Sequence, residues 1–206
     1  MTYADDILLI IHGPSHEAVI TSVEEFLNTI EEWCSKHKLE LSKDKTAIMP
    51  MFVRKRETYN SHPGVNTRGI KVVTEMQYLG VMLDSRLDWY PHTLFLENKI
   101  LHICNNLARC SKAKWGLSYA NLTIIYKHAI LPTITHAAEA WHRSITKRAK
   151  HKLQQIQRTY LIFLTKAYKS VSNDALQAIV GIMPIDQAIS LYKDTKAITR
   201  GQKQTL

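Results

Sequence analysis

Two adjacent carboxylates, Asp5 and Asp6, stand directly before five consecutive apolar residues, Ile7–Ile11. The apolar run is short and ends at the turn signal His12-Gly13-Pro14, which predicts a buried strand. Two neighbouring carboxylates repel each other when both are ionised, and burying either one alone is costly. A cation would offset the repulsion, and Mg²⁺ suits this role because it binds one or two carboxylates together with substrate phosphates. A solvated Asp-Asp turn before a core strand is the alternative.

The composition is that of a globular protein. The chain has 206 residues, of which 45% are hydrophobic and 22% charged, enough for one or two domains. No apolar run approaches the roughly 18 residues of a membrane span, so no membrane contact is expected. The three cysteines show no C-x-x-C spacing, which predicts reduced thiols in an intracellular, reducing compartment.

The net charge of +9 is unevenly distributed along the chain. Residues 1–84 carry 9 basic and 12 acidic side chains, whereas residues 85–206 carry the other 18 basic and only 6 acidic ones. This asymmetry indicates that a polyanion is contacted mainly by the second part. A mitochondrial matrix protein or a ribosome-associated factor could show the same balance, so the charge indicates a class of partner and not an activity.

The spacing of apolar residues divides the chain in two. In the first part a helix is predicted over residues 17–37 with Ser15 as its cap, strands are predicted at 47–52, 70–73 and 77–83, and a polar loop at 54–69. The strand at 47–52 is expected to join the sheet of Ile7–Ile11, and the last two strands to form a hairpin. In the second part helices are predicted over 93–115, 121–142, 146–169, 172–180 and 185–198, the second being kinked or broken at Pro132. The sequence thus predicts an α+β fold, with a mixed domain over 1–84 and a basic helical domain over 85–206.

Several motifs carry a resemblance to a known family. Tyr3-Ala4-Asp5-Asp6, followed by apolar residues, resembles the Y-x-D-D signature of the palm domain of reverse transcriptases. Leu41–Thr46 follows in the order of that family, and Tyr78–Asp84 resembles the YLG-x-x-L-D element of non-LTR, LINE-type retrotransposons. The remainder resembles the region after the polymerase in insect elements that insert into ribosomal RNA genes; the segments concerned are Leu87-Asp88-Trp89 with His92, Ile130-Leu131-Pro132 with Trp141, Gln157-Arg158, and Ser172–Pro184.

The resemblance implies an RNA-directed DNA polymerase that extends a DNA primer on an RNA template with dNTPs. It implies that Asp5 binds two Mg²⁺ ions, that Asp6 supports the site or touches the primer end, and that Tyr3 and Ala4 lie under the primer terminus and the nucleotide. Adjacent strand residues point to opposite faces, so both carboxylates reach one site only from a tight hairpin. Asp5-Asp6 is therefore expected in the turn and Ile7–Ile11 in the return strand.

The family's metal site also needs a third aspartate from an earlier strand, which would have to precede residue 1. The chain is therefore expected to be a C-terminal fragment that is inactive alone and works with the upstream fingers and palm of the same polyprotein. A nuclear location at the site of integration is implied by the family. A non-catalytic nucleic-acid-binding module, in which Asp5-Asp6 is incidental, and a decayed element copy without activity are the alternatives.

Other residues have roles implied by the resemblance. Lys45 corresponds to a lysine thought to assist the departing pyrophosphate as a general acid, although a surface lysine at the start of a strand explains it equally well. The residues Tyr78, Leu79 and Gly80 resemble the primer grip, where glycine lets the nucleic-acid backbone approach closely. A plain hairpin with a bulge glycine is the alternative.

The helix predicted at 146–169 carries an excess of basic residues beside its apolar face. Almost no acidic residues of this segment balance them, which favours a phosphate track that binds without sequence specificity and weakens steeply with salt. In a polymerase this would be the thumb holding the RNA–DNA hybrid, and a solvated polar face is the alternative. The expected contact residues are Lys147, Arg148, Lys150, Lys152 and Arg158.

Overall fold

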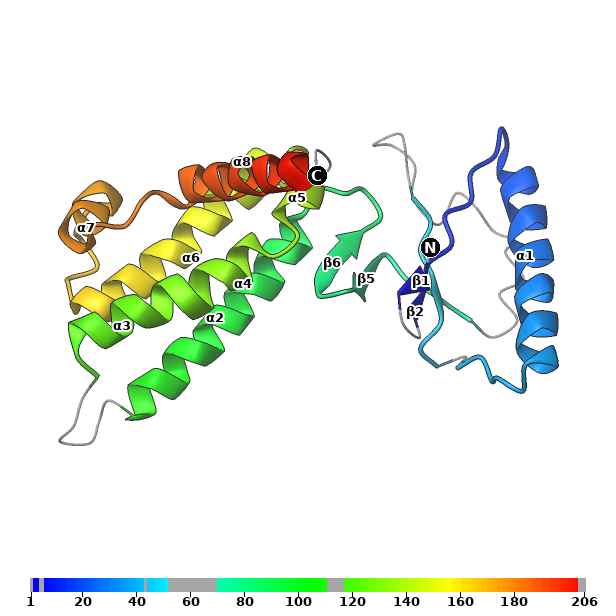
Figure 1. Ribbon diagram of the computed structural model, residues 1–206, viewed down its shortest axis with the longest axis horizontal. Coiled ribbons are helices and arrows are strands. Elements are labelled where there is room, and N and C mark those ends of the chain that lie inside the picture. The colour runs from blue at the N-terminus through cyan, green and yellow to red at the C-terminus, as the bar shows by residue number, and fades with distance from the viewer. Residues whose placement is uncertain (1, 4–5, 43, 52–69, 111–116, 204–206) are drawn as a thin grey trace. The chain divides into compact units, whose positions relative to one another are not determined.

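The computed structural model describes residues 2–3, 6–42, 44–51, 70–110 and 117–203, which form two compact units (Figure 1). The first unit is Met1–Thr74 and the second is Glu75–Leu206. The predicted α+β class is confirmed, since helices dominate and short two-stranded sheets accompany them. The predicted polar loop at 54–69 lies outside the described residues.

The described residues of the first unit form one long helix and four short strands. Strand β1 (Thr2–Tyr3) pairs antiparallel with β2 (Asp6–Ile7), and β3 (Ala47–Ile48) pairs parallel with β4 (Lys71–Val72). Helix α1 (His16–Lys36) is capped as predicted, because the Ser15 hydroxyl accepts a hydrogen bond from the Ala18 N–H at 3.2 Å. Its inward face presents Leu27 and Cys34, both buried.

The predicted buried strand Ile7–Ile11 is wrong. Only Asp6–Ile7 is a strand, and the side chains of Ile7, Leu9 and Ile10 are 46%, 42% and 76% exposed. An apolar run is buried only where another layer covers it, and β2 pairs with β1 alone among the described strands. The strand at 47–52 likewise stays outside this sheet, since β3 pairs with β4 instead.

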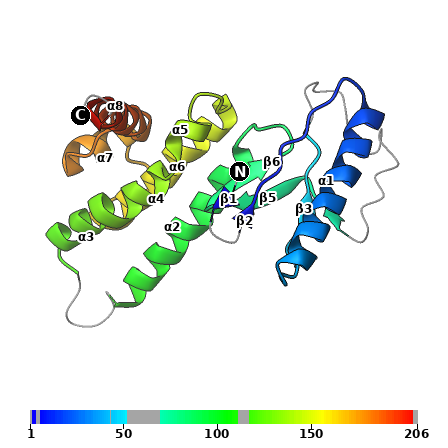
Figure 2. The ribbon, with the colours of Figure 1, turned by 45° about the vertical axis from the view of Figure 1, so that its right-hand side comes forward.

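The second unit begins with a hairpin of β5 (Glu75–Tyr78) and β6 (Val81–Asp84). The predicted pairing of 70–73 with 77–83 is therefore wrong, because residues 71–72 pair with β3. Helices follow, each near its predicted position (Figure 2). They are α2 (Tyr90–Cys110), α3 (Tyr119–Ile125), the π-helix η2 (Tyr126–Ile130), α4 (Leu131–Thr135), α5 (Ala138–Trp141), α6 (Lys147–Thr165), α7 (Asn173–Val180) and α8 (Ile185–Lys203).

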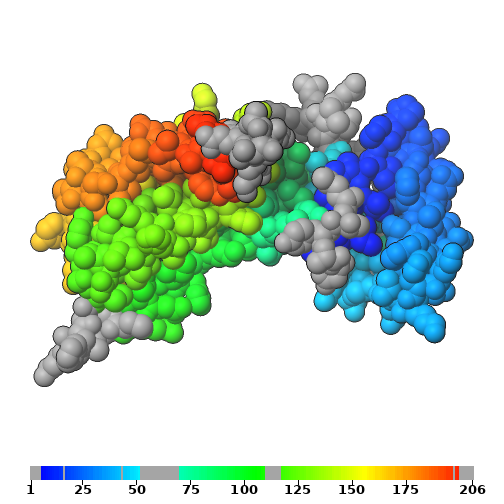
Figure 3. Space-filling model, viewed as in Figure 1, coloured from blue at the N-terminus to red at the C-terminus, as the bar shows by residue number. Residues whose placement is uncertain are grey.

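The core of the second unit lies between these helices. Helix α6 packs against α2, α3, α7 and α8, so it is the central element of the bundle. Its buried residues recur at helical spacing, which is the pattern expected of a helix with one apolar face. Figure 3 shows the helices from α2 to α8 closing into one continuous body. The largest fully buried side chains include Trp141, Tyr126, Tyr160, Leu153, Ile156 and Ile185.

The predicted disturbance at Pro132 takes a specific form. Proline has no N–H and its ring crowds the carbonyl four residues earlier, so an ordinary α-helix cannot continue through it unchanged. The turn before it widens into η2, in which the Leu131 N–H bonds to the Tyr126 carbonyl five residues back. The helix then ends at His136, and Ala137 adopts a left-handed conformation with φ 50°.

The hairpin belongs with the helices rather than with the first 74 residues. Val81 is part of the same buried cluster as Trp89 and Leu96, and β6 packs against α2. The predicted boundary at residue 84 separates this hairpin from the helical part, whereas the structure places the division before Glu75. Among the described helices, none alone is long and apolar enough to cross a membrane, and α7 with residues 185–196 of α8 reaches that length and composition only as a pair bent by 54°.

Candidate functional site

Asp6, the second carboxylate of the pair, lies in a tight antiparallel hairpin. Tyr3 pairs with Asp6 and Thr2 pairs with Ile7, so only residues 4 and 5 connect the two strands. The predicted hairpin is confirmed, but the prediction that Asp6 lies in its turn is wrong, because Asp6 belongs to β2 and pairs with Tyr3. Asp6 is the first residue of β2, and its side chain is exposed. Ala4 and Asp5 lie outside the described residues.

Lys45 lies in a turn directly before β3. The turn is closed by backbone hydrogen bonds from Lys45 and Thr46 to the Ser42 carbonyl, at 3.3 and 3.0 Å, and by the Thr46 hydroxyl, which donates to the same oxygen at 2.8 Å. The Lys45 side chain is exposed. An exposed ammonium at the start of a strand is compatible with either role considered for it.

The turn between β5 and β6 consists of Leu79 and Gly80. The four pairs from Glu75↔Asp84 to Tyr78↔Val81 are continuous, so Gly80 lies in a two-residue turn and not in a bulge. Both turn residues have positive φ, 45° for Leu79 and 81° for Gly80, as a two-residue turn of the primed type requires. The Leu79 side chain is 40% exposed.

Two histidines from the helices bind this hairpin. His136 donates from Nε2 to the Leu79 carbonyl at 3.1 Å, and the Met82 N–H donates to His92 Nδ1 at 3.3 Å. Burial, and to a lesser extent the electrostatic effect of the neighbouring His136 and Lys99, lowers the pKa of His92 to about 4, so the ring stays neutral and Nδ1 remains an acceptor at neutral pH. Neither contact was predicted, because His92 lies 10 residues from Met82 and His136 lies 57 residues from Leu79 in the sequence.

Asp84 organises the connection from the hairpin to α2. Its buried carboxylate accepts hydrogen bonds from the backbone N–H groups of Arg86, Asp88 and Trp89, at 3.0, 3.2 and 3.0 Å. These bonds hold a loop in which Leu87 and Trp89 have positive φ. The last residue of the YLG-x-x-L-D element is therefore structural, fixing how α2 leaves the hairpin.

The basic residues of α6 mostly have partners within the helical unit. Lys152 pairs with Glu97 of α2 at 2.8 Å, Lys150 pairs with Asp186 of α8 at 3.3 Å, and the Arg148 guanidinium lies 3.8 Å from the centre of the Tyr90 ring. The segment itself supplies no acid, as predicted, but two of its lysines are balanced by acids of neighbouring helices, which the sequence analysis did not predict. Arg158 donates to Asn173 Oδ1 at 2.6 Å and to the Lys169 carbonyl, and Lys147 is exposed.

Gln157, buried at the centre of the bundle, makes four hydrogen bonds. Its amide nitrogen donates to the Tyr126 hydroxyl and to the Met183 carbonyl, both at 2.8 Å. Its amide oxygen accepts from Gln177 Nε2 at 3.1 Å and from the Ile185 N–H at 3.0 Å. One side chain therefore fixes α6 to η2, α7 and the start of α8, a role that sequence reasoning did not predict.

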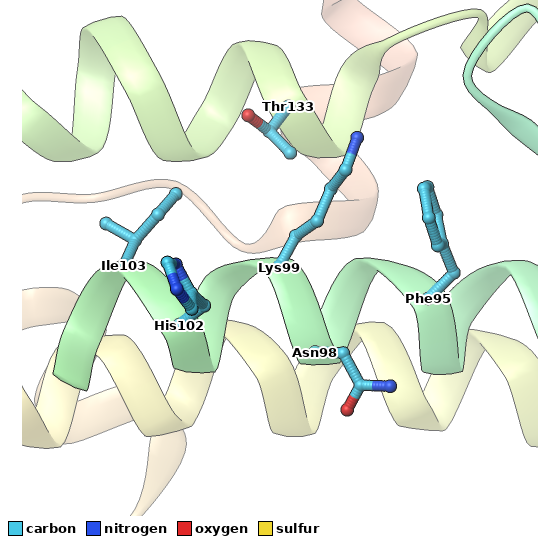
Figure 4. Close-up of a pocket in the computed structure, with 6 residues that line it drawn as sticks. All are labelled: Phe95, Asn98, Lys99, His102, Ile103 and Thr133. Atoms are coloured by element: carbon cyan, nitrogen blue, oxygen red, sulfur yellow. The ribbon is translucent and has the colours of Figure 1, made fainter. Parts of the chain in front are cut away.

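An open groove runs along the outer side of α2 beside α4 (Figure 4). It has a volume of about 530 Å³ and is lined by Phe95, Asn98, Lys99, His102, Ile103 and Thr133. The Lys99 ammonium lies 4.5 Å from the centre of the Phe95 ring. The groove combines a cation with an aromatic ring, and within the described part of the chain no three His, Cys, Asp or Glu side chains gather as metal ligands.

Comparison with known proteins identifies the first part of the chain. Residues 1–83 match the family described as reverse transcriptase (RNA-dependent DNA polymerase). The chain is 26% identical over 201 residues to a retrovirus-related Pol polyprotein from type-1 retrotransposable element R1 4 of Nasonia vitripennis, covering 89% of this chain and 50% of the relative. It is 27% identical over 202 residues to a putative 115 kDa protein in type-1 retrotransposable element R1DM of Drosophila melanogaster, covering 97% of this chain and 19% of the relative.

A third relative is named for an enzymatic activity. The probable RNA-directed DNA polymerase from transposon BS of Drosophila melanogaster is 23% identical over 193 residues, covering 93% of this chain and 21% of the relative. The chain thus spans about half the length of the Nasonia relative and about a fifth of the two Drosophila relatives. No solved structure matches. Residues 1–83 belong to the reverse transcriptase family, and the chain as a whole is related to the Pol polyproteins of type-1, non-LTR retrotransposable elements.

Proposed function

We propose that this chain supplies the carboxylate hairpin, the primer-contacting hairpin and the thumb of an RNA-directed DNA polymerase, which extends a DNA primer on an RNA template in target-primed reverse transcription. The observation that carries the proposal is the pairing of Tyr3 with Asp6 within the segment that matches the reverse transcriptase family. A tight hairpin brings neighbouring carboxylates to one end of the strand pair, as the shared use of one metal site requires.

The residues of this hairpin fit a divalent cation. Asp5 and Asp6 offer oxygen ligands, the kind that Mg²⁺ prefers, and the Asp6 side chain is accessible. In the proposed site Asp5 is the main ligand of two Mg²⁺ ions, Asp6 supports it, and a third aspartate comes from the palm of the same polyprotein. Bound there, Mg²⁺ would activate the primer 3′-hydroxyl and neutralise the triphosphate of the incoming dNTP. Tyr3 and Ala4 would lie under the primer end, and Lys45 would protonate the departing pyrophosphate.

Primer extension tests the proposal. The full-length Pol polyprotein that carries this sequence is expected to incorporate dNTPs on a DNA-primed RNA template, and chelation of divalent metal by EDTA should stop incorporation. Incorporation is measured as the length of the extended primer on a gel, with a DNA template of the same sequence for comparison. Binding of the primed template without any incorporation would favour the non-catalytic module or the decayed copy.

The helical unit is proposed to hold the nucleic acid through its phosphates. Its charge is positive and the match of relatives extends across it. Because Lys152 is paired with Glu97 and its side chain is only 19% exposed, whereas Lys147 is exposed, the two lysines are not equally available to a phosphate. The phosphate contacts are thus expected at Lys147 rather than evenly along α6.

The salt dependence of binding distinguishes these lysines. Lys147→Gln should lower the slope of log K against log salt by about 0.9 on duplex, the value for one lost phosphate contact, equally for all sequences. Lys152→Gln is the matched control and should leave the slope unchanged while lowering the free energy of unfolding, since it leaves Glu97 unpaired. Equal slopes for the parent and the Lys147 variant would show that this end of α6 is an ordinary solvated surface.

A further inference from the structure

The turn that follows Tyr78 holds a residue type that its backbone conformation disfavours. Leu79 has φ 45°, in the left-handed region where a Cβ crowds the following carbonyl. Glycine, asparagine and aspartate are the usual residues at this place in a primed turn. A leucine persists in such a conformation only where its surroundings determine it, and such positions are concentrated at functional sites.

His136 supplies the determining contact. The carbonyl group that it binds, at 3.1 Å from Nε2, is that of Leu79 itself. A Cβ on the next residue, Gly80, would lie 3.2 Å from the same Nε2 and 3.6 Å from Cδ2. A Cβ at position 80 would therefore crowd the imidazole, which would have to shift by a few tenths of an ångström, so the glycine and the histidine are in close contact beside the bond to Leu79.

His136 is itself held by the buried part of the helical unit. Its carbonyl accepts a hydrogen bond from Trp141 Nε1 at 3.0 Å, and Trp141 is fully buried. The Trp141 ring meets His92 edge to face at 5.3 Å, and His92 accepts the hydrogen bond from Met82 on the other strand of the hairpin. His136 therefore binds the turn of the hairpin and His92 binds β6, and Trp141 contacts both histidines.

We propose that His136 is a positioning residue for the primer: it fixes the Leu79–Gly80 turn so that the exposed Leu79 side chain and the Gly80 backbone contact the primer strand. The inference rests on the proposed function. It adds that the turn is held by the hydrogen bond from His136, at the end of α4, to the Leu79 carbonyl. Because His136 directly follows α4, the position of the turn depends on α4 through this one hydrogen bond. His136 itself touches no reacting group.

Two substitutions separate the hydrogen bond from the ring. His136→Gln keeps an N–H donor that can reach Leu79, whereas His136→Phe keeps the ring without a donor. In the full-length Pol polyprotein, His136→Phe should raise the KM for primed template about fivefold, which corresponds to one hydrogen bond, with little change in kcat. His136→Gln should restore the KM to within about twofold of the parent value. His128→Phe, at an exposed histidine of η2, is the matched control and should behave as the parent.

Gly80→Ala gives an independent measurement from the other side of the contact. The added Cβ should displace the imidazole and raise the KM as His136→Phe does. The two effects combined should be less than additive, because both remove the same bond. A merely structural role for His136 would lower the thermal midpoint of both His136 variants and the amount of active enzyme, without raising the KM.

The outcomes separate this inference from the proposed function. If the parent extends primers and His136→Phe keeps the parent's KM, or if His136→Gln and His136→Phe raise it equally, the positioning role is overturned while the polymerase assignment stands. A parent protein that binds the primed template but extends no primer overturns the proposed function, and the positioning role with it.

Discussion

Replacing Asp5 by Ala in the full-length Pol polyprotein is expected to lower dNTP incorporation on a primed RNA template by at least about a thousandfold. A catalytic metal ion supplies several kcal/mol of transition-state stabilisation, and each 1.36 kcal/mol corresponds to about tenfold in rate. The hairpin should survive the change, because Tyr3 and Asp6, which pair across it, are untouched. Asp6→Ala should reduce incorporation less, since Asp6 is proposed to support the site rather than to be its main ligand.

The control for this experiment is Asp44→Ala, which removes an exposed carboxylate from a turn of the same unit. It should leave incorporation unchanged, and the affinity for primed template should be similar in all three variants. Rates are measured by single-turnover primer extension, so that binding and chemistry are separated. Near-parental extension by the Asp5 variant would show that the resemblance to the palm signature has no catalytic meaning in this chain.

Replacing Gln157 by Leu is expected to destabilise the helical unit by about 3 kcal/mol, because each buried polar group left without a partner costs about 1–3 kcal/mol. The Ile185 N–H and the Tyr126 hydroxyl are both buried and would lose their bonds to Gln157. Gln157→Glu should be at least as harmful, since a carboxylate cannot donate to Tyr126 or to the Met183 carbonyl. Urea unfolding followed by circular dichroism measures the change.

Gln155→Leu is the matched control on the same helix. Gln155 is exposed, and the described contact of its side chain is a hydrogen bond to His151 at 3.2 Å, so its replacement should change the free energy of unfolding by no more than about 0.5 kcal/mol. If the Gln157 and Gln155 variants unfolded at the same urea concentration, the buried network would contribute nothing to stability. Nucleic-acid affinity should be unchanged in folded Gln157→Leu, because the network lies inside the bundle.

Local rules predicted the helices and misjudged the strands. The Ser15 cap and the apolar spacing of α6 are properties of neighbouring residues, and both were predicted correctly. The run Ile7–Ile11 was predicted to be buried because it is apolar, yet burial depends on which layer covers a strand, and that is not written in the strand itself. The parallel pairing of β3 with β4 joins residues more than 20 positions apart and is equally invisible to a local pattern.

In the candidate site, too, features that depend on neighbouring residues were predicted and features that depend on distant partners were not. The motif of four residues was sufficient to predict a hairpin at this place, but not its register, in which Asp6 pairs with Tyr3 instead of lying in the turn. The roles of His136, His92 and Gln157 depend on partners that only the folded chain brings together. The positive charge of α6 was visible in the sequence. The ion pairs that two of its lysines form with Glu97 and Asp186 were not, because these acids belong to other helices.

The π-helix η2 has a consequence for insertions and deletions. A single π-helical turn is equivalent to one extra residue inserted in an α-helix, and each residue of an α-helix turns the chain by about 100°. His136 lies six residues beyond the end of η2, at Ile130. Removing one codon from Tyr126–Ile130 would let this turn close as ordinary α-helix and leave the residues beyond it near their present orientation, whereas removing one codon from α3 would rotate them by about 100° and carry the imidazole away from Leu79. The segment that can lose a residue without changing which side chain meets the hairpin is therefore η2.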